Sequence, residues 1–149
     1  MATVSGITRI LVVEDFEPFR QFVCSTVSKK PELRIVAEAS DGLEAVRLAT
    51  ELQPDLILLD VGLPWLNGIE AAREIRKLAP KAKIIFVSQE PSANIVQEAL
   101  AIGAAGYVAK KDALHLLAAV EAVLGGGQFV SDRLLGQMVK TPPLTASDD

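Results

Sequence analysis

The sequence has little of what secreted, membrane-spanning or DNA-contacting proteins depend on. It contains one cysteine, Cys24, so no disulfide can form within the chain, and a reducing compartment is favoured. No run of about 18 apolar residues occurs, and the apolar stretch at 10–13 is too short for the core of a signal peptide. We therefore expect a cytoplasmic, soluble protein with no membrane partner.

Positive charge is also scarce. Lys and Arg total 15 against 19 Asp and Glu, which gives a net charge of -4, and the basic residues are scattered along the chain. A duplex-binding surface requires a basic stripe or patch, so direct nucleic-acid contact by these residues is not expected. The chain of 149 residues is 50% apolar and 23% charged, which predicts one folded domain rather than a disordered chain.

Short apolar runs alternate with helical patterns along the whole chain. Each run is continuous rather than alternating, as in strands that are buried on both faces, except for a mixed run that is expected to form an edge strand. Proline or glycine follows several of the helical patterns. The expected strands are 10–13, 34–38, 56–59, 84–87 and 106–109. The helical patterns lie at 19–27, 43–49, 69–78, 95–102 and 114–124. The residues expected to end helices are Pro31, Pro54, Pro80 and Gly103.

This order predicts an α/β fold of the doubly wound kind. Five β-then-α units with short connections give a five-stranded parallel sheet with helices on both faces. The flavodoxin-like strand order 2-1-3-4-5 is expected. Residues 8–131 are assigned to the domain, ending in a short extended piece at 129–131, and residues 132–149 to a short C-terminal helix and a flexible tail or linker.

Polar residues fall where the predicted strands end. Glu14 and Asp15 follow the first strand, Asp60 the third, Ser88 the fourth and Lys110 the fifth. In an open parallel sheet these ends share one edge, where ligands bind in a crevice. Three carboxylates, a hydroxyl and an ammonium are therefore expected to meet there.

The chemistry of these groups favours a magnesium-dependent phosphoryl transfer. Clustered carboxylates repel one another unless a cation intervenes, and their hard oxygen atoms suit Mg²⁺. Aspartate can accept a phosphoryl group, whose oxygens Lys110 and Ser88 could contact. Singly, each residue has an ordinary alternative, such as a solvated loop carboxylate, a strand-end hydroxyl or a surface lysine. Their convergence on one edge favours the functional interpretation.

The motifs resemble those of the receiver domain of bacterial two-component response regulators, from about Thr8 to Ser131. The matching segments are Ile10-Leu-Val-Val-Glu-Asp15, Asp55-Leu-Ile-Leu-Leu-Asp-Val-Gly-Leu-Pro64 with Asn67-Gly68, Val87-Ser88, and Gly103-Ala-Ala-Gly-Tyr-Val-Ala-Lys110. The resemblance implies that Asp60 is the phosphoacceptor and Lys110 the phosphate partner. It further implies that Mg²⁺ is bound by Glu14, Asp15, Asp60 and the Gly62 carbonyl, and that Ser88 and Tyr107 form the switch, with Tyr107 turning in from the surface.

Finer features are similar to the NarL/LuxR-type subgroup, whose members usually continue into a DNA-binding helix-turn-helix. They are Glu17-Pro18, Lys110-Lys-Asp112 and Gly126-Gly-Gln-Phe-Val130. The resemblance implies a sensor histidine kinase as partner and control of an output, transcription being expected. It also implies a possible homodimer through the fourth helix, fifth strand and fifth helix, or through the first and fifth helices. A truncated regulator and a free-standing receiver both stay open.

Competing functions fit the sequence less well. A haloacid-dehalogenase-type enzyme needs a second acid two residues after its aspartate, where this chain has Gly62. A dinucleotide site needs a glycine-rich turn where Glu14 and Asp15 stand, and no Walker A segment occurs. A phosphorylation-independent docking or dimerisation module is the remaining alternative. Gln89, in place of the family's usual small residue after Ser88, is expected to narrow access to the site.

Overall fold

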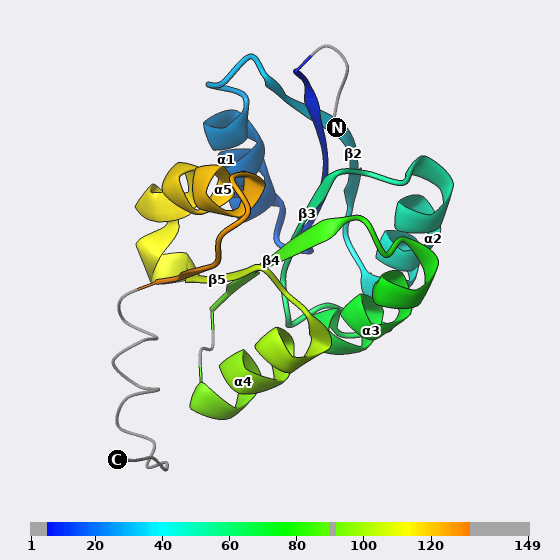
Figure 1. The fold of residues 1–149 in the computed structure, drawn as a ribbon. Coiled ribbons are helices and arrows are strands. Elements are labelled where there is room, and N and C mark those ends of the chain that lie inside the picture. The colour runs from blue at the N-terminus through cyan, green and yellow to red at the C-terminus, as the bar shows by residue number, and fades with distance from the viewer. Residues whose placement is uncertain (1–5, 90–91, 132–149) are drawn as a thin grey trace.

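A computed structural model describes residues 6–89 and 92–131, and shows a parallel sheet between two layers of helices (Figure 1). The strands are β1 (Thr8–Val13), β2 (Leu33–Ala39), β3 (Leu56–Leu59), β4 (Lys83–Ser88), β5 (Gly106–Ala109) and β6 (Phe129–Val130). The helices are α1 (Glu17–Val27), α2 (Gly42–Leu52), α3 (Gly68–Leu78), α4 (Ala93–Ile102) and α5 (Leu116–Leu124), with a 3₁₀ helix, η1 (Lys110–His115), before α5. None of the helices in the described ranges is long and apolar enough to cross a membrane.

The sheet has the order β2-β1-β3-β4-β5-β6, and every pair of neighbouring strands is parallel. The predicted order 2-1-3-4-5 is confirmed. The structure adds β6, which pairs with β5 through Gly106–Phe129 and Tyr107–Val130 in the segment predicted to be extended. The chain after residue 131, predicted as a helix and tail, lies outside the described residues.

Both faces of the sheet are buried, which explains why the strand runs are continuously apolar. Ile10 and Val12 pack with apolar residues of α1 and α5, while Leu11 and Val13 pack with those of α2, α3 and α4. Figure 1 shows α1 and α5 together on one side of the sheet, with α2, α3 and α4 on the other. Over the central strands β1, β3, β4 and β5 the two layers leave the strand ends open, whereas the edge strands β2 and β6 are partly exposed.

Side-chain caps begin three of the helices. The Asp41 carboxylate accepts a hydrogen bond from Glu44 N at 2.8 Å, and the Asn67 amide oxygen accepts one from Glu70 N at 2.9 Å, so Asn67 is confirmed as the cap of α3. Ser92 caps α4 in the same way. Gly103 ends α4 with a φ of 109°, the left-handed conformation that the sequence predicted at this glycine.

The buried face of the last helix differs from the predicted one. The sequence pattern pointed to Leu114, Leu117, Val120 and Leu124, yet the fully buried residues are Leu116, Ala119, Val120 and Val123. Leu114 is 89% exposed because it belongs to η1, in which Asp112 has a non-helical backbone. This irregular turn changes the phase of the helix that follows, which a regular 3.6-residue period could not reveal.

Two glycines let the loop after β3 pack directly against helix backbones. A Cβ atom on Gly68 would lie 2.0 Å from the Asp60 carbonyl oxygen, and one on Gly42 would lie 1.7 Å from the Leu66 carbonyl oxygen. Gly68 N also donates a hydrogen bond to the Val61 carbonyl at 2.7 Å. The start of α3 is therefore in backbone contact with Asp60, which fixes the position of that residue.

Replacing Gly68 by Ala is expected to destabilise the fold by about 3 kcal/mol, because the added methyl group must displace backbone rather than a flexible side chain. Urea unfolding of the purified protein measures the change. Gly125→Ala is the matched control, because a Cβ there would lie an ordinary 3.4 Å from the Glu121 carbonyl oxygen, and its effect is expected to stay within about 0.5 kcal/mol. Equal effects of the two substitutions would contradict the close contact.

Candidate functional site

The predicted strand-end residues meet in one cavity of about 470 Å³ at the carboxyl edge of the sheet. Asp60 directly follows β3, Ser88 is the last residue of β4, and Lys110 directly follows β5. The turn after β1 contributes Glu14 and Asp15. The remaining lining residues are Phe16, Val61, Gly62, Gln89 and Ile95. The parallel strands thus bring together residues that lie up to 96 positions apart.

The three carboxylates form a cluster. One oxygen from each of Glu14, Asp15 and Asp60 can be chosen so that all three lie within 4.8 Å of one another. Glu14 and Asp60 are buried, at 3% and 6% exposure, whereas Asp15 is exposed. Hard oxygen donors at this spacing, open to solvent on one side, fit a divalent cation that keeps part of its water shell.

Lys110 lies between the two buried carboxylates. Its Nζ is 2.9 Å from Glu14 Oε1 and 3.6 Å from Asp60 Oδ2. The ammonium group also lies 4.7 Å from the centre of the Phe19 ring, a cation–π distance. Lys111, the next residue, is exposed, so the lysine that directly continues the strand is the one in the site.

Backbone amides hold the carboxylates in place. Phe16 N donates to Glu14 Oε2 at 3.0 Å, and Gly62 N donates to Asp60 Oδ1 at 3.4 Å. Asp60 N donates to the Val13 carbonyl at 3.1 Å, which ties the start of the loop after β3 to β1. Gly62 lies at the cavity, as predicted, and its service as a carbonyl ligand stays a prediction.

Burial raises the pKa of both interior carboxyl groups. For Glu14, the loss of water raises the pKa, and the Phe16 amide and Lys110 oppose the rise. For Asp60, burial again raises the pKa, the Lys110 charge opposes it, and the Asp15 charge adds to it. Asp60 is therefore a buried carboxyl group whose ionised form is disfavoured by burial and by Asp15 and favoured by Lys110.

Ser88 and Tyr107 are neighbours on the last two long strands. Both are buried, and the Tyr107 ring packs 5.8 Å from that of Phe86, centre to centre. Burial raises the pKa of the Tyr107 hydroxyl, while its interaction with Ser88 lowers it and the charge of Asp60 raises it further. The expectation that Tyr107 starts at the surface is wrong for this structure, in which the ring is 0% exposed and already inside.

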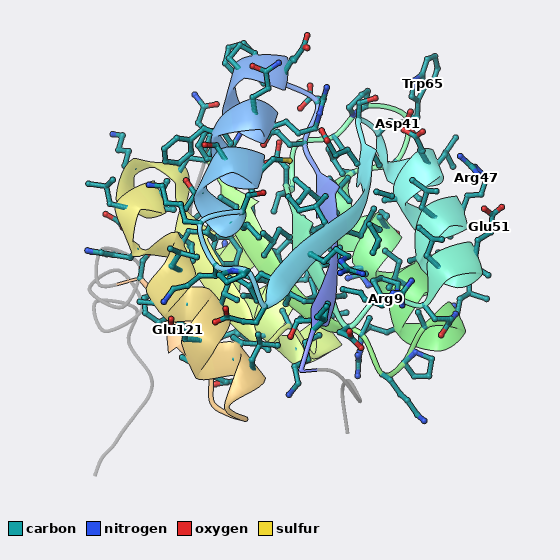
Figure 2. All side chains as sticks on the ribbon, turned by 90° about the horizontal axis from the view of Figure 1, so that it is seen from above. Arg9, Asp41, Arg47, Glu51, Trp65 and Glu121 are labelled. Atoms are coloured by element: carbon teal, nitrogen blue, oxygen red, sulfur yellow. The ribbon has the colours of Figure 1, made fainter. Side chains whose placement is uncertain are left out.

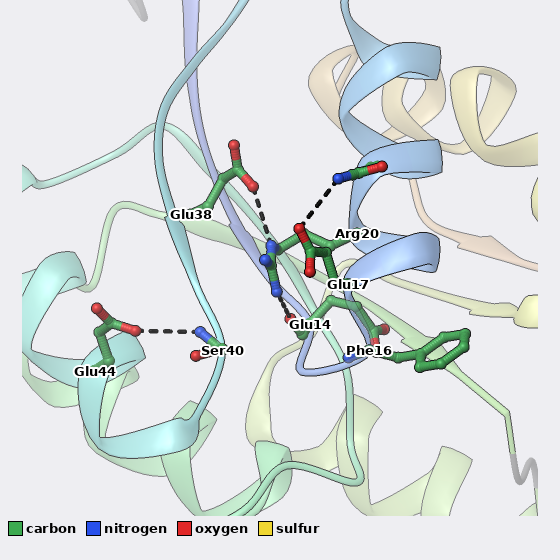
Figure 3. Close-up of polar contacts among 8 residues, drawn as sticks. Glu14, Phe16, Glu17, Arg20, Glu38, Ser40 and Glu44 are labelled. Carbon is green, nitrogen blue, oxygen red and sulfur yellow. Dashed lines mark hydrogen bonds and ion pairs between the residues drawn. The ribbon is translucent and has the colours of Figure 1, made fainter.

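Sequence reasoning missed Arg20, which contacts the acidic turn, the segment after β1 that carries Glu14 and Asp15. Its Nη1 donates to the Glu14 carbonyl at 2.8 Å, and its Nε pairs with Glu38 Oε1 at 3.0 Å (Figure 3). An arginine in the first turns of an apolar helix, shortly after two acidic residues, was the available signal. Only the tertiary structure shows that β2 supplies its carboxylate partner.

Trp65 lies outside the cavity but on the loop that follows Asp60. Its side chain is 83% exposed and projects from the surface near Asp41 (Figure 2). Its φ of 70° lies in the left-handed region, which is unusual for a residue with a large side chain. An indole this exposed on the loop after Asp60 is placed to report changes in that loop by its fluorescence.

The arrangement defines a class of protein: a doubly wound α/β domain with an acidic, lysine-containing site at the carboxyl edge of its parallel sheet. Comparison with known families identifies one family. The profile described as the response regulator receiver domain matches residues 10–121, and the chain belongs to this family. Receiver domains are phosphoacceptors of two-component systems rather than enzymes that turn over a small-molecule substrate.

Relatives and solved structures agree with the NarL/LuxR-type resemblance. The chain is 33% identical over 133 residues to the transcriptional regulatory protein DegU of Brevibacillus brevis, covering 89% of this chain and 56% of that protein. It is 32% identical to the transcriptional regulatory protein LnrK of Bacillus subtilis (strain 168), covering 88% of this chain and 60% of the relative. The chain thus spans less than two thirds of these relatives.

One solved structure matches nearly the whole chain. It is a two-component response regulator of the LuxR family from Aurantimonas sp. SI85-9A1, with a TM-score of 0.85, 33% identity, and coverage of 90% of this chain and 96% of that one. The receiver domain of the putative regulator NarL from Mycobacterium tuberculosis matches with a TM-score of 0.76 at 30% identity, over 80% and 98% of the two chains.

Cys24 is not expected to be a reactive thiol. Burial, together with the neighbouring Glu38 carboxylate, raises the pKa of its thiol to about 11, so at pH 8 the thiol stays protonated. Alkylation by iodoacetamide at pH 8 is expected to be at least about tenfold slower in the folded protein than in urea. Mass spectrometry over time measures both rates, and equal rates would contradict the protected thiol.

Proposed function

We propose that this chain accepts a phosphoryl group on Asp60 from a sensor histidine kinase, in a Mg²⁺-dependent reaction, and thereby controls an output. The observation that carries the proposal is the position of Asp60. This carboxylate is buried at the base of the cavity, next to two further acids and within 3.6 Å of a lysine ammonium group.

The acidic cluster fits the expected cation. Asp15, Asp60 and the Gly62 carbonyl would hold Mg²⁺, with Glu14 acting through water because its two oxygens already contact Lys110 and Phe16 N. When bound, Mg²⁺ neutralises charge on the oxygens of a phosphoryl group in transfer. The chain's own contribution is to keep these oxygens on one side of Asp60.

Asp60 is the proposed nucleophile. One of its carboxylate oxygens forms a bond to phosphorus while the bond from phosphorus to the donor histidine nitrogen breaks. Lys110 is placed to contact a phosphoryl oxygen, since its ammonium already faces Asp60, and Ser88 lines the same cavity. Attack of water on phosphorus would later release the phosphoryl group and restore the carboxylate, so the domain would promote both its own phosphorylation and dephosphorylation.

The switch would pass through Ser88 and Tyr107. A phosphoryl group on Asp60 adds charge and acceptor oxygens that draw the Ser88 hydroxyl and Lys110 toward it. Since the Tyr107 ring is already inside, the effect would be to retain the ring there and to change its partner, rather than to pull it in. A coupling of about 1 to 3 kcal/mol is enough to shift the balance between two arrangements of α4 and β5.

The output and assembly follow from the relatives. DegU and LnrK are both described as transcriptional regulatory proteins, and the chain resembles their shared portion, so transcription is the proposed output of the whole protein. With a net charge of -4, the receiver itself is not proposed to touch DNA. A homodimer through α4, β5 and α5, or through α1 and α5, stays a prediction.

Incubation with Mg²⁺ and acetyl phosphate is expected to add one phosphoryl group per chain, and Asp60→Asn should abolish this gain because the nucleophilic oxygen is lost. Intact-protein mass spectrometry measures the gain, and removal of Mg²⁺ by EDTA should also abolish it. Asp55→Asn is the control, because Asp55 lies at the opposite end of the same strand, where it accepts a hydrogen bond from Arg9 N. No gain in the unaltered protein, with no change in Trp65 emission on adding beryllofluoride, would favour a docking module instead.

Replacing Ser88 by Ala is expected to leave phosphoryl acceptance intact but to weaken the response by about 1 to 3 kcal/mol, since the hydroxyl that links Asp60 to Tyr107 is removed. Amide NMR shifts of β5 and α4, recorded with and without beryllofluoride, measure the response. Ser25→Ala, on the exposed side of α1, is the control. An undiminished response in the Ser88 variant would rule out the relay.

A further inference from the structure

Arg20 contacts the carbonyl groups of the two residues on either side of Asp15. Its guanidinium Nη1 donates to the Glu14 carbonyl at 2.8 Å, and its backbone N donates the first helical hydrogen bond of α1 to the Phe16 carbonyl at 3.0 Å. Of the two contacts, the one with Glu14 depends on the arginine side chain. Asp15 is also the exposed member of the acidic cluster, so its direction depends on the backbone that carries it.

The guanidinium is anchored from the far side by β2. Nε pairs with Glu38 Oε1 at 3.0 Å, and the Arg20 side chain is only 18% exposed, against 48% for Glu38 (Figure 3). Glu38 also lies beside Cys24, whose pKa it helps to raise. Arg20 thus joins the edge strand to the acidic turn, as Figure 3 shows by its place between Glu38 and Glu14.

Glu14 is held by its backbone at both ends as a result. Its N donates to the Ala39 carbonyl at 3.0 Å as the sheet continues, and its carbonyl accepts from Arg20 at 2.8 Å. A partly exposed ion pair such as Arg20–Glu38 adds little to the stability of a fold by itself. Its value here lies in geometry, because a planar guanidinium can donate in two fixed directions at once.

We propose that Arg20 is a positioning residue for the cation site: clamped by Glu38, it fixes the peptide groups around Asp15 so that the Asp15 and Glu14 carboxylates face Asp60. This inference rests on the proposed function. It assigns no ligand atom to Arg20, whose Nε donates to Glu38 and whose Nη1 donates to the Glu14 carbonyl. The same contact would tie the direction of the acidic turn to β2.

The direction in which the Kd for Mg²⁺ changes when Arg20 is replaced separates a positioning role from an effect of its charge. Arg20 is a cation near a cation site, so electrostatics alone predicts tighter Mg²⁺ binding when its charge is removed. A positioning role predicts the reverse. We expect Arg20→Gln to raise the Kd for Mg²⁺ about tenfold, the lower end of the range seen when a residue that orients metal ligands is removed. Isothermal titration calorimetry with MgCl₂ at fixed ionic strength measures it.

Conservative and control variants sharpen the test. Arg20→Lys keeps the charge, but its compact ammonium cannot reproduce the planar fork, so Kd should stay raised several-fold, by roughly half of the tenfold effect or more. Arg47→Gln removes the same charge from α2, where Arg47 pairs with Glu44 and Glu51, and should leave Kd unchanged. Urea unfolding of each variant verifies that it is folded under the conditions of titration.

A double-mutant cycle tests the anchor, and Arg20→Lys takes the place of Arg20→Gln in this cycle should the latter fold poorly. Electrostatic effects of removing Arg20 and Glu38 should add, whereas loss of a shared clamp should not. The Arg20→Gln/Glu38→Gln protein is therefore expected to bind Mg²⁺ no more weakly than Arg20→Gln alone. Additive losses, or unchanged or tighter binding by folded Arg20→Gln, would overturn the inference while leaving the metal site in place. Failure of the unaltered protein to bind Mg²⁺ would overturn the metal site itself, and the inference with it.

Discussion

One ammonium group holds the acidic edge of this domain together. Lys110 reaches Glu14 from one side and Asp60 from the other, and without its charge two buried carboxylates would face each other next to a third. Burial raises the pKa of both interior acids, and the lysine opposes that rise in each case. The negative charge of the two buried acids is therefore offset by one ammonium group. A phosphoryl group or a divalent ion in the site would act by changing what Lys110 contacts.

Around Glu14 and Asp60, the neighbouring residues fix the position of the backbone that carries the two carboxylates. Gly68 and Gly42 allow the loop after β3 to lie against helix starts at distances that no Cβ atom would permit, which places Asp60. Arg20 does the corresponding work for the turn after β1 through two carbonyl groups. Both turns that carry the acids are thus attached to rigid elements, which suits a site whose function depends on oxygen positions.

The inward position of Tyr107 links this edge to the interior of the domain. Its ring packs on Phe86 from the next strand, and its hydroxyl interacts with Ser88 at the cavity. In the proposed switch, a change in the charge on Asp60 would therefore act on a group already in the core, two strands from β3. Because packed interiors have discrete arrangements, a small shift at Ser88 can select between them rather than deform them gradually.

The sequence by itself determined the sheet, the order of its elements and the strand-end residues of the site. Continuous apolar runs such as 56–59, bounded by turn residues, are typical of strands buried on both faces. Parallel strands in this order bring Glu14, Asp60 and Lys110 to one edge of the sheet. The tertiary structure alone decided the phase of α5 and the inward ring of Tyr107. It also decided the partner of Arg20. These features depend on an irregular turn, on packing between strands, and on Glu38, which lies 18 residues from Arg20 on β2. Local periodicity carries no record of such contacts, since they arise only when the elements have been placed side by side.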